Sequence, residues 1–190
     1  MRTLPGLFLT LAIGAATGLG LTALTVSGGN GAGVLQIGPW LATPKAGTNE
    51  ADPYARAATA RLGTLPLALA DGLALTATRD DEGAPLDGRC TYLVSGTMPP
   101  ARFWTLTAAG EDWRPVVDES IRQGFTSHEI VRFGSRPADI TLGPEARPGN
   151  WLPSGGAPRI RLILRLYDTP IATTISAGTA MPSIRRRSCP

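Results

Sequence analysis

The chain has 190 residues, 43% of them hydrophobic and 6% aromatic, and it contains 23 Gly and 17 Pro. Gly and Pro together make up about 21% of the chain, more than the average of about 12% but less than the roughly 25–30% of disordered low-complexity chains. We therefore predict one folded domain with many turns. The formal net charge is +3, and 17 of the 18 basic residues are arginines scattered along the chain. Without a basic stripe or a reader motif, we expect no nucleic-acid partner.

The chain begins with a long apolar segment. No charged residue occurs from Leu4 to Val26, and as a helix these 23 positions would span about 35 Å, enough to cross a hydrocarbon core of about 30 Å. Because Arg2 precedes the segment and the next positive charge is Lys45, we expect the N-terminus in the cytoplasm and the remainder exported. We favour an uncleaved signal anchor. The alternative is a signal peptide cleaved near Val26–Gly28, although its apolar region would normally span only about 7–15 residues.

These features predict a bacterial inner-membrane protein that crosses the membrane once, with its C-terminal domain in the periplasm. The predicted parts are a membrane anchor over residues 1–27, a flexible Gly-rich tether over 28–38 and a β-sandwich domain over 39–190. Gly14 and Gly18 form a Gly-xxx-Gly pair, so one face of the anchor is small enough for close contact with a partner helix. We therefore expect contact with the lipid bilayer and weak homo-oligomerisation through this face.

One helix is predicted between Asp52 and Gly63. Asp52 suits the N-cap, Pro53 suits the first helical position and Gly63 suits the C-terminal stop. The apolar residues that recur every four positions are Tyr54, Ala58 and Leu62. This pattern predicts a short helix whose narrow apolar face lies on a larger body.

Beyond this helix the apolar residues alternate, as in strands. Predicted strands lie at 73–78, 89–95, 103–107, 139–142, 160–167 and 171–176, and a capping-box pattern at 126–129 predicts a single helical turn. The clearest strand carries Ile160, Leu162, Leu164 and Leu166 on one face. Short strands separated by frequent turns predict a mainly all-β fold, a jelly-roll-like β-sandwich with one short helix, preceded by a single N-terminal transmembrane helix.

The chain has two cysteines, Cys90 in a predicted strand and Cys189 in the Arg-rich tail. In an exported domain both would meet an oxidising environment, in which disulfides persist. We favour a bridge between them that staples the tail to the sandwich. A free thiol, a lipid-modified thiol and an intermolecular bridge are the alternatives.

Five stretches carry a family resemblance, namely Asp52–Ala57, Pro85–Tyr92, Pro99–Leu106, Gly149–Pro153 and Leu164–Asp168. Together they are similar to the domain-of-unknown-function family 1214, in its short bacterial form with an N-terminal membrane segment. The resemblance covers residues 40–189, and its Phe-Trp and Asn-Trp-Leu-Pro pieces are the more specific. It implies a jelly-roll-like β-sandwich outside the inner membrane, and it implies no activity.

The sequence lacks the residues that several kinds of catalysis require. His128 is the single histidine, which excludes paired-histidine metal sites, and no Gly-x-Ser-x-Gly elbow occurs. We therefore predict no metal and no cofactor, and we interpret His128 as an exposed residue of a helical turn. The acidic turn Asp80–Glu82 could bind a hard cation, but a solvated loop is the favoured interpretation.

Paired carboxylates are the remaining catalytic option, because a sandwich can hold two acids across a groove for glycoside hydrolysis. The candidate carboxylates are Asp87, Asp112, Asp118, Glu119 and Asp168. Such an enzyme would use two of them beside Trp151 and Arg165.

The candidate ligand-binding residues are Trp104, Trp151, Arg165 and Asp168. A Trp beside Pro and Gly, such as Trp151, can stack on a sugar or a partner side chain, although core packing is the favoured alternative for both tryptophans. Arg165 could pair with a ligand anion, and a structural pair between Arg165 and Asp168 is the favoured alternative.

Three functions follow from these features. The favoured one is a non-catalytic, membrane-anchored binding or accessory module of the bacterial cell envelope, with a protein or a glycan as its partner. The alternatives are a carbohydrate-active envelope enzyme that uses two carboxylates, and a structural subunit of an inner-membrane complex contacted through Gly14 and Gly18.

Overall fold

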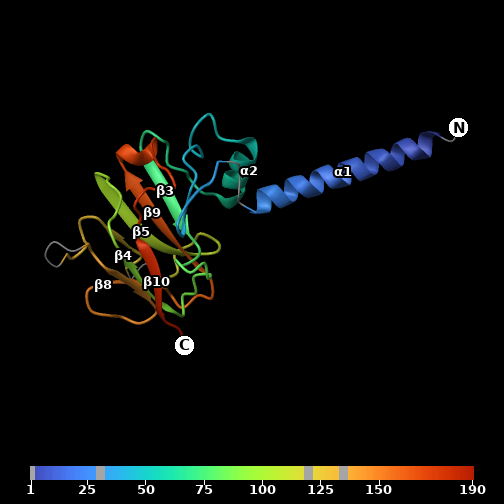
Figure 1. The fold of residues 1–190 in the computed structure, drawn as a ribbon. Helices are drawn as coiled ribbons and strands as arrows, with labels where there is room; N and C mark the ends of the chain where they lie inside the picture. The colour runs from blue at the N-terminus through green and yellow to red at the C-terminus, as the bar shows by residue number, and fades with distance from the viewer. Residues whose placement is uncertain (1–2, 29–32, 118–121, 133–136) are drawn as a thin grey trace.

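The structure is a computed structural model that describes residues 3–28, 33–117, 122–132 and 137–190. Its helical elements are α1 (Thr3–Gly28), α2 (Pro53–Leu62) and the 3-10 turn η1 (Pro170–Ala172) (Figure 1). Its strands are β1 (Leu35–Ile37), β2 (Trp40–Ala42), β3 (Gly72–Ala77), β4 (Thr91–Ser95), β5 (Phe103–Gly110), β6 (Gly124–Thr126), β7 (Ile140–Gly143), β8 (Asn150–Pro153), β9 (Ile160–Tyr167) and β10 (Ser183–Ser188).

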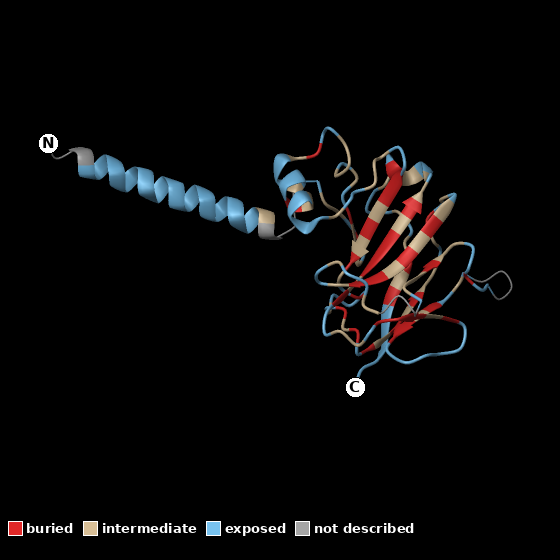
Figure 2. Cartoon of the chain, turned by 180° about the vertical axis from the view of Figure 1, so that it is seen from behind, coloured by how far each residue is buried: buried red, intermediate tan, exposed pale blue. Residues whose placement is uncertain are grey.

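α1 is a long apolar helix that projects away from the rest of the chain (Figure 1). Its segment Pro5–Val26 has 22 residues and a mean hydropathy of 1.9, and no part of it is buried (Figure 2). The helix is long and apolar enough to cross a membrane, a property that membrane anchors share with signal sequences.

The strands form two sheets. The six-stranded sheet has the order β1-β2-β3-β9-β5-β6, and all its neighbours are antiparallel. The four-stranded sheet has the order β10-β4-β7-β8, in which only β7 and β8 run parallel. The long strand β9 therefore lies at the centre of the larger sheet, between β3 and β5.

One hydrophobic core lies between the sheets, because alternate residues of each strand point inward. From the six-stranded sheet it includes Trp40, Leu73, Leu75, Trp104, Leu106, Leu162, Leu164 and Leu166. From the four-stranded sheet it includes Tyr92, Val94, Ile140, Leu142, Leu152 and Ile184. The bands of buried residues along the strands show this alternation (Figure 2). The prediction of a mainly β chain folded as a two-sheet sandwich is confirmed, and its jelly-roll connectivity stays a prediction.

The predicted helix between Asp52 and Gly63 is confirmed as α2. Gly63 ends it in the left-handed conformation, with φ of 63°, and its backbone N–H donates to the carbonyl of Ala60. The predicted apolar face is buried only in part, because Ala58 is 8% exposed whereas Tyr54 and Leu62 are 44% and 45% exposed. α2 therefore packs through one small residue and leaves larger apolar side chains accessible.

The predicted tether overlaps the first strand. Residues 29–32 lie outside the described residues, but Leu35–Ile37 already pairs with β2, four positions before the predicted start of the sandwich at 39. Ile37 is 4% exposed and belongs to the core. The sheet begins early because the alternation of Leu35, Gln36 and Ile37 leads into a tight turn, in which Gly38 has a φ of 56°.

Two predicted elements differ from the observed ones. Residues 127–129 form a turn rather than a helical turn, although the Glu129 carboxylate accepts a hydrogen bond from the Thr126 backbone N–H, as in half of a capping box. Residues 171–176 form no strand. Thr169 instead caps η1 by accepting from the Ile171 N–H, so the chain coils at Pro170.

Candidate functional site

A cavity of about 420 Å³ lies on the outer face of the six-stranded sheet. Strand register builds its floor, because Leu41 on β2 lies opposite Thr76 on β3, which lies opposite Ile163 on β9. In the next row Ala74 lies opposite Arg165. These five residues share the outer face because their neighbours along each strand fill the core.

The walls of the cavity come from the chain before and after α2. The wall residues include Thr43, Pro44, Leu62, Leu65, Pro66 and Leu67. The two segments meet at Gly47, where a Cβ atom would collide with the backbone carbonyl of Leu67. Glycine is therefore required at position 47 to close this side of the cavity.

Arg165 is the one basic side chain that lines the cavity. It is half-buried and makes no hydrogen bond or ion pair with any residue that the structure describes. Asp112, the one acidic residue of the lining, has Oδ2 3.7 Å from Nε of Arg114 and accepts the backbone N–H of Arg114. The cavity therefore presents a cation that no described carboxylate neutralises.

Trp113 lines the same cavity from the hairpin that follows β5. The Arg161 guanidinium lies 4.1 Å from the centre of its ring and donates to the carbonyls of Gly110 and Glu111. Burial lowers the pKa of Arg161, while the nearby charges of Glu111 and Asp112 raise it. Trp113 has a φ of 66°, a conformation that costs of the order of 1–3 kcal/mol for a bulky residue. The stack on Arg161 thus holds Trp113 in a strained position at the cavity wall.

The predicted ligand-binding residue Trp104 lies in the core rather than at the site. It is 5% exposed and points inward on β5, on the same face as Leu106. A ligand cannot reach it, so the prediction of a ligand contact is wrong for Trp104. The alternative given with that prediction, core packing, describes it correctly.

Trp151 lies on the other sheet from Arg165. It occupies the outer face of β8, is half-buried, and donates its indole N–H to the carbonyl of Gly143 at 3.0 Å. Arg165 belongs to β9 of the six-stranded sheet. The predicted groove that would contain both residues is therefore not formed.

Asp168 forms a turn after β9 and does not pair with Arg165. Its Oδ2 atom lies 3.6 Å from Nη1 of Arg102, and both side chains are exposed. Its backbone, with a φ of 47°, donates to the carbonyl of Asp71 and accepts from the N–H of Arg102. The prediction that Asp168 and Arg165 form one cluster is wrong, and Arg165 stands alone in the cavity.

The candidate carboxylates that the structure describes each pair with a separate arginine. The pairs are Asp87 with Arg89 at 2.6 Å, Asp112 with Arg114 at 3.7 Å and Asp168 with Arg102 at 3.6 Å. The hydrogen bond from Arg89 holds the pKa of Asp87 below its ordinary value. Asp118 and Glu119 lie outside the described residues. Within the described residues, these acids are thus ion-paired at separate positions.

The acidic turn supports the fold through Asp80 and Asp81. Asp80 is 2% exposed, and its Oδ1 accepts the backbone N–H groups of Glu82 and Ala84. Oδ2 of Asp81 accepts the N–H of Ile184 on β10. The described residues contain no group of three His, Cys, Asp or Glu side chains that could hold a metal ion.

The remaining predicted residues lie apart from the cavity. Cys90 and Cys189 form a disulfide, the pairing that the sequence favoured, and it joins the start of β4 to the end of β10. His128 is exposed, and its ring contacts the edge of Phe103 with the centroids 5.4 Å apart. On α1, Gly14 and Gly18 have open space around them, so self-association through them stays a prediction.

Trp113 and Ile163 are site residues that were not predicted from the sequence. Ile163 is an apolar residue on the wetter face of β9 and is nevertheless 5% exposed, which shows that this face is covered. A β-branched apolar residue between two outward arginines, Arg161 and Arg165, was the available signal. Trp113, in a polar turn, gave no comparable signal.

Residues 71–171 match the family described as "Protein of unknown function (DUF1214)". A comparison with curated proteins gave no match. Among solved structures, the chain is similar to the VPA0106 protein from Vibrio parahaemolyticus, with 22% identity and a TM-score of 0.59 over 73% of this chain and 36% of that one. It is also similar to an uncharacterised protein from Burkholderia cenocepacia, with 19% identity and a TM-score of 0.42 over 63% of this chain and 32% of that one.

The chain spans about a third of the length of these two solved proteins, and the likeness to the first shows the fold alone. The family match covers more than half of the chain and runs from the residue before β3 into η1, so it includes both Trp113 and Arg165. The chain belongs to the DUF1214 family of proteins of unknown function.

Proposed function

We propose that this chain is a membrane-anchored, exported module of the bacterial cell envelope that binds a ligand and catalyses no reaction on it. The observation that carries the proposal is the cavity of about 420 Å³ on the outer face of the six-stranded sheet, with Arg165 unpartnered among the described residues. Ligand sites are typically concave, of about 300–1,000 Å³, and mostly apolar with a few polar groups. The partner expected from the sequence is a protein or a glycan, and crosslinking distinguishes these classes.

The proposed location is the bacterial inner membrane, with one membrane pass and the sandwich in the periplasm. α1 is long and apolar enough for the pass. The disulfide Cys90–Cys189 fits an oxidising compartment. Alkaline phosphatase fused after Pro190 should therefore be active and β-galactosidase at the same position inactive. The reverse result would place the sandwich in the cytoplasm and overturn the proposed location.

The separate arginine partners of the candidate acids support a binding role over glycoside hydrolysis. That reaction needs two carboxyl groups about 5–9.5 Å apart across one groove. Asp112 lines the cavity and pairs with Arg114, whereas Asp87 pairs with Arg89 elsewhere. The proposed module therefore holds its ligand through Arg165 and the apolar walls.

Site-specific crosslinking in living cells tests the binding role. A photoreactive residue replaces Thr64, which lines the cavity, and a second chain carries it at Arg187 on the edge strand β10 as the control. We expect an adduct from position 64 that position 187 does not give. Absence of an adduct at position 64, or the same adduct at both positions, would overturn the proposal. The class of the adduct, whether protein, glycan or lipid, identifies the partner.

A further inference from the structure

We infer that the cavity binds an anionic amphiphile, a molecule with an alkyl or acyl chain and one carboxylate or phosphate group. The inference rests on the proposed binding function and names the ligand class of the same site. Its evidence is the lining of the cavity, the isolated charge of Arg165 and the short distance along the chain to α1.

The walls suit a flexible apolar chain. The large aliphatic residues of the lining are Leu41, Leu62, Leu65, Leu67, Leu73 and Ile163. Leu65 is 93% exposed and Leu62 is 45% exposed, although the core of the same chain buries other leucines completely. Exposed apolar side chains gathered at one cavity mark a binding surface, and an acyl chain lying between them would remove them from water.

The lining suits a sugar less well. Sugar sites use aromatic rings as stacking platforms, and Trp113 is the one aromatic residue of the lining. Arg161 already stacks on a face of that ring at 4.1 Å. The lining also contains hydrogen-bonding side chains, among them four threonines, so the case against a sugar rests on the lack of a second aromatic platform.

Arg165 supplies the head-group contact. Arg165 makes no hydrogen bond or ion pair with a described residue, and a carboxylate or phosphate would accept two parallel hydrogen bonds from its guanidinium. Asp112 is 65% exposed at its side chain and faces Arg114, so it does not neutralise Arg165. Arg165 lies one register row from Ile163, which places the charge beside the apolar floor.

The chain length keeps the cavity near the bilayer when α1 spans it. Gly28, the end of α1, and Leu35, the start of β1, are seven positions apart in the sequence, and at 3.3–3.6 Å per position this stretch reaches at most about 25 Å. Gln36 of β1 pairs directly with Leu41 of the cavity floor. The cavity therefore stays within about 30 Å of the membrane surface, where lipid-derived amphiphiles occur.

The test uses the full chain in nanodiscs of zwitterionic lipid, with empty nanodiscs subtracted. Octanoate, octyl phosphate, octanol and inorganic phosphate are titrated separately by calorimetry. We expect octanoate or octyl phosphate to bind, and octanol and inorganic phosphate to bind at least about tenfold more weakly. The stronger of the two anionic probes separates a fatty acid from a phospholipid head group. Equal binding of octanol, or equal binding of inorganic phosphate alone, would overturn the inference.

Matched variants assign the binding to the cavity. Arg165→Gln should weaken binding of the anionic probe about tenfold without changing octanol binding, Arg165→Lys should restore part of it, and Arg187→Gln on β10 should change nothing. Ala74→Leu, which fills the floor beside Arg165, should weaken the anionic probe and octanol alike. Thermal unfolding of each variant checks that it folds. Unchanged binding in both Arg165→Gln and Ala74→Leu would exclude this cavity.

The experiments can contradict the amphiphile inference without contradicting the proposed binding function. If the octyl probes do not bind but crosslinking at Thr64 yields a protein or glycan adduct, the amphiphile inference is wrong and the binding function stands. If neither experiment shows a ligand, both are wrong.

Discussion

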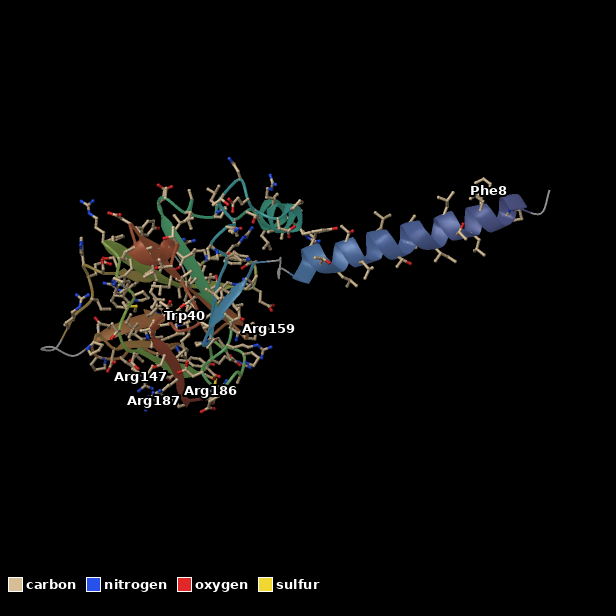
Figure 3. All side chains as sticks on the ribbon, turned by 45° about the horizontal axis from the view of Figure 1, so that its top comes forward. Phe8, Trp40, Arg147, Arg159, Arg186 and Arg187 are labelled. Atoms are coloured by element: carbon tan, nitrogen blue, oxygen red, sulfur yellow. A yellow bond between two sulfur atoms is a disulfide. The ribbon has the colours of Figure 1, made fainter. Side chains whose placement is uncertain are left out.

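Nη2 of Arg186 lies 3.0 Å from Oδ2 of Asp80, a carboxylate that is 2% exposed. The contact is an ion pair rather than a well-aligned hydrogen bond, since Oδ2 has no hydrogen-bond partner. Arg186 also donates to the carbonyl of Pro85, and it extends with Arg187 from β10 (Figure 3). Arg186 thus adds an ion pair to the hydrogen bonds between Asp81 and Ile184 that hold the acidic turn against the four-stranded sheet.

We expect Asp80→Asn to destabilise the fold by about 2–3 kcal/mol, because it leaves the partly buried Arg186 without its counter-ion. Asp168→Asn is the matched control, since it breaks the exposed pair with Arg102 and should cost at most about 1 kcal/mol. Urea unfolding of the detergent-solubilised chain measures both. Equal losses for the two variants would show that the buried pair has no special role.

The disulfide Cys90–Cys189 closes a long loop, with a sequence separation of 99 between the two cysteines. In the chain-entropy model, replacing both cysteines by serine should lower the free energy of unfolding by up to about 4–5 kcal/mol. Mass spectrometry of the unreduced protein after alkylation should find no free thiol. Two alkylated cysteines in the native protein would contradict the structure.

Two substitutions at Trp113 separate the effect of backbone strain on stability from the effect of ring stacking. Trp113→Ala loses the contact with Arg161 and keeps the left-handed φ of 66°. Trp113→Gly loses the same contact but accepts that φ freely, so it should be more stable than Trp113→Ala by about 1 kcal/mol. Thermal unfolding compares the two variants directly. A glycine variant no more stable than the alanine variant would mean that position 113 carries no backbone strain.

The stability of the fold should depend on the ionisation of Asp87. Its pKa is lowered chiefly by the hydrogen bond from Arg89 and lies below the unfolded-state value of about 4. A depressed folded-state pKa contributes stability above about pH 4, and this contribution is lost as the pH falls through the folded-state pKa. Melting temperatures between about pH 2 and pH 6 should therefore fall less steeply for Asp87→Asn than for the parent chain. Parallel curves would contradict the ion pair.

The spacing of apolar residues predicted those strands and helices in which one face is regularly buried. β9 shows this best, because Ile160, Leu162, Leu164 and Leu166 alternate along it and all are buried. α2 was likewise predictable from Pro53 at its start and Gly63 at its end, whereas the side chain of the predicted N-cap, Asp52, makes no capping hydrogen bond. β10 was not, because Ile184 is its one core residue and three arginines follow. Its strand conformation comes from pairing with β4, a tertiary effect that local sequence does not carry.

The cavity could be predicted only in part. Arg165 was proposed from its place in a clear strand, but its neighbours at the site come from β2, β3, the chain around α2 and the hairpin at Trp113. No spacing rule connects segments that lie so far apart in sequence. Trp104 shows that residue type alone can also predict a site residue that the fold buries. Its residue type suits a ligand contact, yet its register on β5 turns it into the core.

The central place of β9 has a consequence for how the chain folds. β3 and β5 both use β9 as a neighbour, but β9 begins 83 positions after β3 ends and 50 positions after β5 ends. During synthesis, both strands therefore emerge with an open edge until residues 160–167 follow. Long-range pairing of this kind folds slowly and leaves edges prone to aggregation. The sandwich should thus need protection by a chaperone until β9 is made and joins the two parts of the sheet.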